Sequence, residues 1–167
     1  MYKTISEFVE DWGRESAISL NVQRALTDAS LQQKSDPEGN TLGKIAWHMV
    51  VMIGMTGSAA GLEITAPSRG SEPPSSAASI ADAYQTAAQS MAEQASKKLR
   101  DEQLASEMTY FGRSLPMARI LQSLVRHQIH HRGQMTILMR QAGVVVPGVY
   151  GPSREETAAM RARQKGS

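Results

Sequence analysis

The sequence of 167 residues contains no cysteine. Without cysteine it cannot build a disulfide framework, a thiolate nucleophile or a zinc site with sulfur ligands. Any metal ion must therefore be bound through histidine nitrogens and carboxylate oxygens. The chain has only four histidines, and three of them lie in the segment HQIHHRGQ at residues 127–134. These histidines are the first candidates for chemistry.

Long apolar runs are also missing. No segment approaches the about 18 consecutive apolar residues that are needed to cross a bilayer. Residues 1–12, MYKTISEFVEDW, carry acidic side chains instead of the basic flank and apolar stretch of a signal peptide. We therefore expect a soluble, cytoplasmic protein without a membrane partner.

A strong excess of one charge is absent as well. The chain has 18 basic and 16 acidic residues, and only 5% of its residues are aromatic. A nucleic-acid surface would need a basic stripe with aromatic side chains for stacking, and neither is found. The only basic cluster comprises Arg154, Arg161, Arg163 and Lys165. We interpret it as a solvated tail at residues 153–167 and expect no nucleic-acid partner.

The residues that are abundant point to an all-α protein. Hydrophobic residues make up 41% of the chain and ten of them are methionine, which is typical of a core between helices. The length suits a single domain over residues 1–167. Apolar residues recur at helical spacing in four segments: residues 4–33, 41–63, 79–100 and 114–143.

The connections predict how these helices are arranged. Residues 34–40, KSDPEGN, are a short turn, so the first two helices should run antiparallel. Residues 65–78 are rich in Pro, Ser and Gly, and form a loop long enough to let the third helix run parallel to the second. The pattern predicts a four-helix bundle with one long crossover.

Several residues should mark the ends of these elements. Ser79 with Asp82 resembles a capping box, and Pro116 suits the first turn of a helix that starts at Ser114. Gly143 suits the C-terminal end of that helix. Residues 101–113 show no helical stripe, and MTYFG at residues 108–112 could form a short extended segment or a hairpin. A capping pattern from Ser153 to Glu156 predicts a short terminal helix.

Helical geometry separates the three clustered histidines. At roughly 100° per residue, with His127 at zero, the apolar side chains of the last long helix lie between about 20° and 120°. On the same scale His131 falls at roughly 40°, inside this stripe, and His127 lies at its edge. His130 points away at roughly 300°. His127 and His131 therefore form an i, i+4 pair on the inward face, a spacing that lets two imidazoles bind one ion.

The same construction on the second helix places His48 at the border of its inward stripe and facing the core. Three neutral imidazoles from two helices would leave coordination positions for water or substrate, as in catalytic zinc sites. Hydrogen-bonded or surface histidines would produce the same spacing, so the residues alone leave both interpretations open.

Three motifs make the chain resemble a known family. They are G-x-I-A-W-H at Gly43–His48, H-x-x-x-H-R-G-Q at His127–Gln134, and Q-A-G-V-x-V-P-x-x-Y-G-P at Gln141–Pro152. They resemble the DinB-like family of metalloenzymes, whose superfamily includes bacillithiol S-transferases and mycothiol-dependent enzymes. The resemblance implies an up-down-down-up four-helix bundle and a homodimer. It also implies a divalent ion, nickel or zinc, bound by His48, His127 and His131.

The resemblance further implies an activity on a small molecule. The site would activate either water for hydrolysis or a low-molecular-weight thiol for transfer, and a chain without cysteine must receive the thiol as a cosubstrate. The alternative is a non-catalytic, stress-related protein that binds a metal or ligand. A fourth protein ligand would favour this alternative, and exchangeable positions under an open pocket would favour catalysis.

Some further residues are candidates for supporting roles, and each is equally consistent with an ordinary surface or loop position. His130, Gln134, Tyr110 and Arg113 could orient a substrate. Arg132 and Gln134 could instead hydrogen-bond behind the ligands or across a dimer. Gly133 suggests a close approach between helices. Trp47 faces away from the inward stripe, so it is expected at a dimer interface or against the first or third helix.

Overall fold

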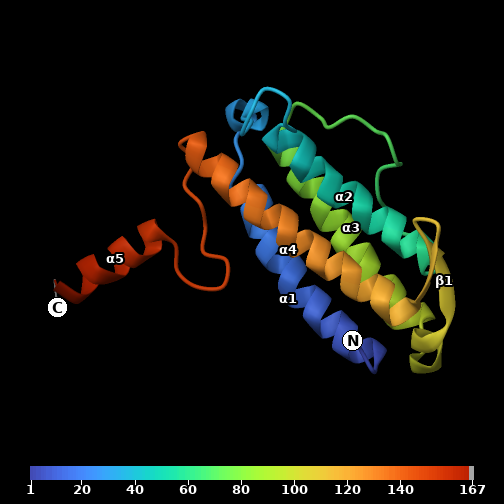
Figure 1. The fold of residues 1–167 in the computed structure, drawn as a ribbon. Helices are drawn as coiled ribbons and strands as arrows, with labels where there is room; N and C mark the ends of the chain where they lie inside the picture. Colours follow the sequence, from blue (N-terminus) through green and yellow to red (C-terminus); the bar gives the residue numbers. More distant parts are fainter. Residues whose placement is uncertain (166–167) are drawn as a thin grey trace.

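The computed structural model describes residues 1–165, so the last two residues of the predicted tail lie outside the described part. Within this part the protein is mostly helical, with five α-helices and one two-stranded sheet (Figure 1). The α-helices are α1 (Ile5–Arg24), α2 (Leu42–Ala59), α3 (Ala77–Lys98), α4 (Met117–Gln141) and α5 (Arg154–Lys165). Two short 3-10 helices, η1 (Asp28–Gln32) and η2 (Asp101–Ala105), join them. No helix in residues 1–165 is both long and apolar enough to span a membrane.

The four long helices pack in pairs around an aliphatic and methionine-rich core. α1 contacts α3 and α4, and α2 contacts the same two helices. Figure 1 shows α1 to α4 side by side, whereas α5 projects away from them. Trp12, Tyr84, Met49 and Leu124 are among the largest fully buried side chains. This packing brings α2 and α4, which carry the histidines, into contact.

The all-α prediction needs a correction at the hairpin. β1 (Glu107–Tyr110) and β2 (Arg113–Pro116) form an antiparallel pair in which Tyr110 faces Arg113. Phe111 and Gly112 at the tip have φ values of 47° and 73°, the left-handed conformation that a two-residue hairpin turn requires. The hairpin expected around MTYFG is therefore confirmed. Because β2 includes Ser114, α4 begins at Met117 and Pro116 is the residue before it, not within its first turn.

Helix 1 is shorter than its apolar pattern predicts. α1 ends at Arg24, and the Thr27 hydroxyl caps η1 by accepting a hydrogen bond from the Ser30 backbone. These local bonds replace the helical ones, so the segment expected to continue to residue 33 breaks into two. α2 likewise ends at Ala59, before Gly61 at φ 76°. The first residue of α3 is Ala77, because Ser76, not Ser79, provides the cap.

The predicted C-terminal features are confirmed. α4 ends at Gln141, and Gly143 adopts the positive φ of 72° that favours glycine after a helix. Ser153 and Glu156 form the reciprocal hydrogen bonds of a capping box. None of the α5 side chains is buried.

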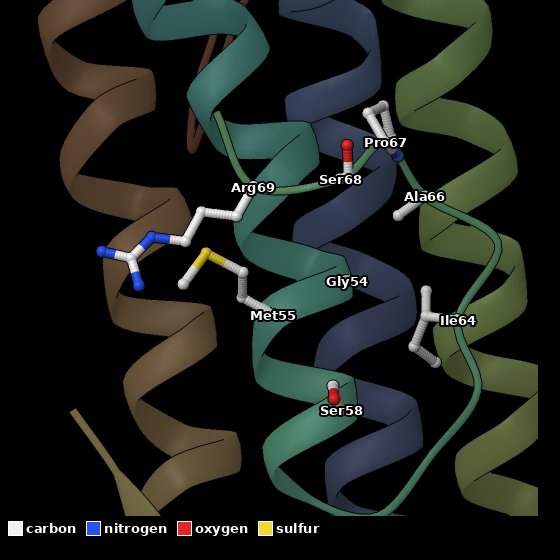
Figure 2. Close-up of a pocket in the computed structure, with 8 residues that line it drawn as sticks. All are labelled: Gly54, Met55, Ser58, Ile64, Ala66, Pro67, Ser68 and Arg69. Atoms are coloured by element: carbon white, nitrogen blue, oxygen red, sulfur yellow. The ribbon is translucent and has the colours of Figure 1, made fainter. Parts of the chain in front are cut away.

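The crossover loop between α2 and α3 returns along the surface of α2. Two glycines of α2 allow this close approach: a Cβ at Gly57 would lie 2.1 Å from Ile64 Cγ1, and one at Gly54 would lie 2.8 Å from Ala66 Cβ. Figure 2 shows five loop residues beside α2: Ile64, Ala66, Pro67, Ser68 and Arg69. Together with Gly54, Met55 and Ser58 of α2 they line a pocket of 370 Å³. Trp47 donates a hydrogen bond from its indole N–H to Ser71 of the same loop. The polar group of this side chain is therefore directed at the loop and not at α1 or α3. The loop therefore covers the side of α2 next to His48.

Candidate metal centre

The three predicted ligands converge at one point between α2 and α4. His127 Nε2 lies 3.0 Å from Nε2 of His48 and 3.0 Å from Nε2 of His131. The candidate ligand atoms of all three residues lie within 4.8 Å of one another. We call these residues the histidine triad. No carboxylate belongs to the triad among residues 1–165.

The triad lies closer to the surface than the helical wheel of α2 predicts. His48 is exposed, and His127 and His131 are half-buried. The expectation that His48 faces the core is therefore wrong. The helices α2 and α4 pack against each other on the inner side of the imidazoles and do not enclose the rings. This position leaves one side of the triad open to solvent.

Hydrogen bonding fixes the tautomer of His131. Its Nδ1 lies 2.6 Å from Gln134 Oε1, and an amide oxygen only accepts hydrogen bonds. Nδ1 therefore carries the ring proton, and Nε2 of the neutral ring presents a lone pair to the triad. Gln134 therefore hydrogen-bonds behind His131, the position predicted for it from the sequence.

Hydrogen bonds among the three rings cannot satisfy all three Nε2 atoms of the triad. Nε2 of neutral His127 presents either one proton or one lone pair, so at most one of its two short contacts is a full hydrogen bond. Its other nitrogen, Nδ1, is buried without a hydrogen-bond partner among residues 1–165. A cation between three lone pairs would satisfy all three Nε2 atoms at once. The donor set of the triad thus fits a divalent ion.

The spacing and the electrostatics agree with this fit. Ligand nitrogens about 2.05 Å from a tetrahedral ion are roughly 3.3 Å apart, so the 3.0 Å contacts need to open by only a few tenths of an ångström. Burial, together with the neighbouring imidazoles, lowers the pKa of His127 to about 4. Burial also lowers the pKa of His48 and of His131. All three rings are therefore neutral near pH 7, the protonation state in which imidazole binds metals.

A cavity of 520 Å³ opens directly beside the triad. His48, His131 and Gln134 line it, together with Lys44 of α2. The remaining lining residues are Ser35, Gly39, Asn40 and Ile45. Lys44 and His48 also border a second cavity, of 270 Å³, beneath the crossover loop. A small molecule in the larger cavity would reach two of the three imidazoles.

The other residues singled out in the sequence lie elsewhere. His130 is exposed and outside the triad, with its ring centroid 4.9 Å from that of His131. Tyr110 hydrogen-bonds to Thr56 from the hairpin, and neither Tyr110 nor Arg113 lines the cavity of 520 Å³. Apart from the backbone of its own helix and its two chain neighbours, no atom of residues 1–165 lies within 4 Å of a Cβ built on Gly133, so the close helix approach expected there is wrong.

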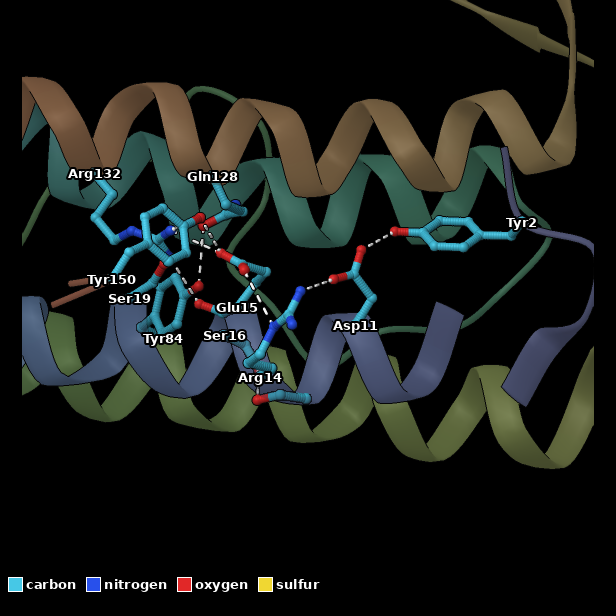
Figure 3. Close-up of polar contacts among 11 residues, drawn as sticks. Tyr2, Asp11, Arg14, Glu15, Ser16, Ser19, Tyr84, Gln128, Arg132 and Tyr150 are labelled. Atoms are coloured by element: carbon cyan, nitrogen blue, oxygen red, sulfur yellow. Dashed lines mark hydrogen bonds and ion pairs between the residues drawn. The ribbon is translucent and has the colours of Figure 1, made fainter. Parts of the chain in front are cut away.

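Arg132 was expected behind the ligands or across a dimer, and this expectation is wrong. The side chain is 1% exposed and points into the core, where it forms an ion pair of 2.7 Å with Glu15 of α1. It also donates hydrogen bonds to Ser19 and to Tyr150. Figure 3 shows this group between α1 and α4, with the Tyr150 ring over the guanidinium. Arg132 therefore joins α1, α4 and the segment that precedes α5.

Comparisons with known proteins support the family suggested by the motifs. A profile of the DinB family matches residues 1–165. The uncharacterized protein YrdA of Bacillus subtilis is 40% identical over 158 residues, which is 95% of each chain. A crystal structure of a DinB-like protein from Bacillus cereus superposes with a TM-score of 0.86 and 41% identity, over 90% of this chain and 100% of that one. A second DinB-like protein, YjoA of Bacillus subtilis, shares the fold at a TM-score of 0.67 and 14% identity, over 86% and 97% of the two chains.

Proposed function

This chain belongs to the DinB family, and we propose that it is a divalent-metal-dependent enzyme whose ion is bound by His48, His127 and His131. One observation carries the proposal, namely the convergence of three neutral imidazoles that protons cannot fully satisfy. We propose zinc or nickel, because both ions accept imidazole nitrogen as a ligand.

The reaction we propose is transfer or hydrolysis on a small molecule. When bound, a divalent ion supplies an electrophilic centre that lowers the pKa of a water or a thiol. The thiol would be a low-molecular-weight cosubstrate, because the chain has no cysteine. The residues of the chain bind and orient: Gln134 holds His131 in the tautomer that presents Nε2, and the open cavity beside the triad gives a substrate access. Lys44 and Asn40 offer hydrogen-bond donors to it.

The absence of a fourth protein ligand in the triad favours catalysis over a purely structural ion. Among residues 1–165 the triad includes three histidines and no carboxylate, and it borders a cavity of 520 Å³. A closed structural site would surround the ion with four protein ligands. A non-catalytic, stress-related binding protein remains the alternative outcome of the experiment below.

We also propose an up-down-down-up four-helix bundle in a single domain over residues 1–167. The pairing of α1 and α2 with α3 and α4 supports the bundle, and so does the loop that carries the chain back along α2 before α3 begins. The family resemblance leads us to propose a cytoplasmic homodimer, which cell fractionation and light scattering after size-exclusion chromatography would test.

The proposed activity can be tested by comparing loaded and metal-free protein. We expect the protein loaded with Zn²⁺ or Ni²⁺ to accelerate either conjugation of a small thiol to an electrophile or ester hydrolysis without thiol. The metal-free protein and loaded His131→Ala should show only the background rate, since both lack the intact centre. His130→Ala is the matched control, because this neighbouring imidazole is exposed and outside the triad.

The outcomes separate the candidate functions. Rate acceleration only in the presence of thiol assigns transfer, and acceleration without thiol assigns hydrolysis. Equal rates with and without metal would contradict the proposal. Tight metal binding without either reaction, across panels of electrophiles and esters, would assign the non-catalytic alternative.

A further inference from the structure

We propose that Gln128 is a positioning residue, which sets the spacing between His48 and His127 and thereby the affinity of the triad for its ion. This inference rests on the proposed function, because it concerns the same metal centre. Gln128 directly follows His127 on α4 and is 0% exposed. Roughly 100° of helical rotation separates the two side chains, so His127 reaches the triad while Gln128 enters the core.

Both ends of the Gln128 amide are used. Its Nε2 donates a hydrogen bond of 3.0 Å to the Met49 carbonyl of α2. Its Oε1 accepts a hydrogen bond of 3.0 Å from the Tyr84 hydroxyl of α3. Burial raises the pKa of Tyr84, so the hydroxyl stays protonated and remains a donor. Tyr84 therefore fixes which end of the amide faces α2.

The hydrogen bond to Met49 connects the two helices at the height of the triad. Met49 follows His48, and Gln128 follows His127, so the link joins neighbours of two ligands on different helices. Figure 3 shows Gln128 projecting from α4 toward the interior with Tyr84 below it. A site of three imidazoles tolerates displacements of only about 0.5 Å. A fixed link one residue away from both ligands is placed to limit such displacements.

Arg132 follows His131 in the same way but connects α4 to α1, which carries no ligand. A second buried amide offers a closer comparison. Gln23 of α1 is also 0% exposed, and its Nε2 donates to the Ala46 carbonyl of α2 at 3.1 Å. Both glutamines thus anchor a helix to the backbone of α2, but only Gln128 links the two helices that carry the triad. If the link positions the ligands, the two residues must differ in their effect on metal binding.

The test compares Gln128→Met with Gln23→Met. Methionine keeps the length of the side chain and removes both hydrogen-bonding groups. We would titrate Zn²⁺ into metal-free, full-length protein in competition with a chromogenic chelator, after circular dichroism has established the helical fold. We expect Gln128→Met to raise the Kd for Zn²⁺ about 10- to 100-fold. Both variants should lower the melting temperature, because each removes a buried hydrogen bond. Gln23→Met should nevertheless leave the Kd for Zn²⁺ at the wild-type value.

Tyr84→Phe provides a milder variant should Gln128→Met fail to fold. It removes only the hydroxyl that orients the amide, so we expect a smaller rise in Kd in the same direction. An unchanged Kd in Gln128→Met and Tyr84→Phe, or an equal rise in Gln23→Met, would overturn the positioning role while the metal centre itself stands. A wild-type protein that does not bind Zn²⁺ in this titration would overturn the proposed function and the positioning role together.

Discussion

Replacing Arg132 by methionine is expected to reduce the free energy of unfolding by about 3–5 kcal/mol. Arg132 and Glu15 are 1% and 2% exposed, and their charged groups are 2.7 Å apart. Methionine fills much of the space of the arginine stem but leaves the buried Glu15 carboxylate with two side-chain partners, the Tyr150 hydroxyl and the exposed Arg14 at 3.5 Å. The cost of burying the carboxylate without its buried counter-ion is the source of the loss. Chemical denaturation monitored by circular dichroism would measure it.

Two control variants show whether the buried charge is responsible. Arg132→Met combined with Glu15→Leu should recover much of the lost stability, because an apolar pair often replaces a buried ion pair without cost. Arg140→Met on the same helix breaks the pair with Glu155, in which the two side chains are 33% and 31% exposed, and should have a much smaller effect. If the Arg132 and Arg140 variants lose equal stability, the structural role assigned to the buried pair is wrong.

Removing the metal ion is expected to lower the melting temperature of the wild-type protein by roughly 5–10 °C. Binding to the folded state alone adds about 2.7 kcal/mol of stability when the free ion is at 100 times its Kd. The triad joins α2 to α4, and unfolding separates its members, so the unfolded chain lacks the site. Thermal unfolding with and without a chelator would measure the shift.

The histidine variants provide the control for this shift. His131→Ala should melt at the same temperature with and without the chelator, because one of the three ligands is missing. His130→Ala should keep the wild-type shift, since this exposed residue lies outside the triad. A chelator effect of equal size in His131→Ala would mean that the ion stabilises the protein from another site.

Helix positions could be predicted from the sequence better than helix ends. Apolar spacing located α1 to α4, because periodicity reflects which face is buried. The ends depend on local competition that periodicity does not report. Thr27 caps a separate 3-10 helix, Ser76 starts α3 earlier than predicted, and pairing with β1 draws Ser114 into a strand. The Gly112 that follows Phe111 was the one local sign of the hairpin turn.

The triad was predictable for the same reason that the helices were. His127 and His131 share a face of α4 by geometry alone, and the distance to His48 follows from how α2 packs on α4. The exposure of His48 and the cavity next to it could not be predicted, because they depend on the path of residues 34–40. Gln128 was missed, and Arg132 was assigned to the wrong place, although both polar residues lie on or next to the apolar stripe of α4. A polar residue at a buried helical position is the signal that would have found both.

The most direct test of the metal centre is the metal content of the protein purified without a histidine tag. Elemental mass spectrometry would measure this content in the wild type, His48→Ala and His131→Ala. Each protein would be measured as purified, and again after incubation with Zn²⁺ or Ni²⁺ and removal of the free ion. We expect about one ion per wild-type chain, and close to none in either variant, because a three-ligand site depends on each imidazole. A wild-type chain without metal after incubation, or variants that keep the full ion content, would contradict the assignment of the triad as the ligands.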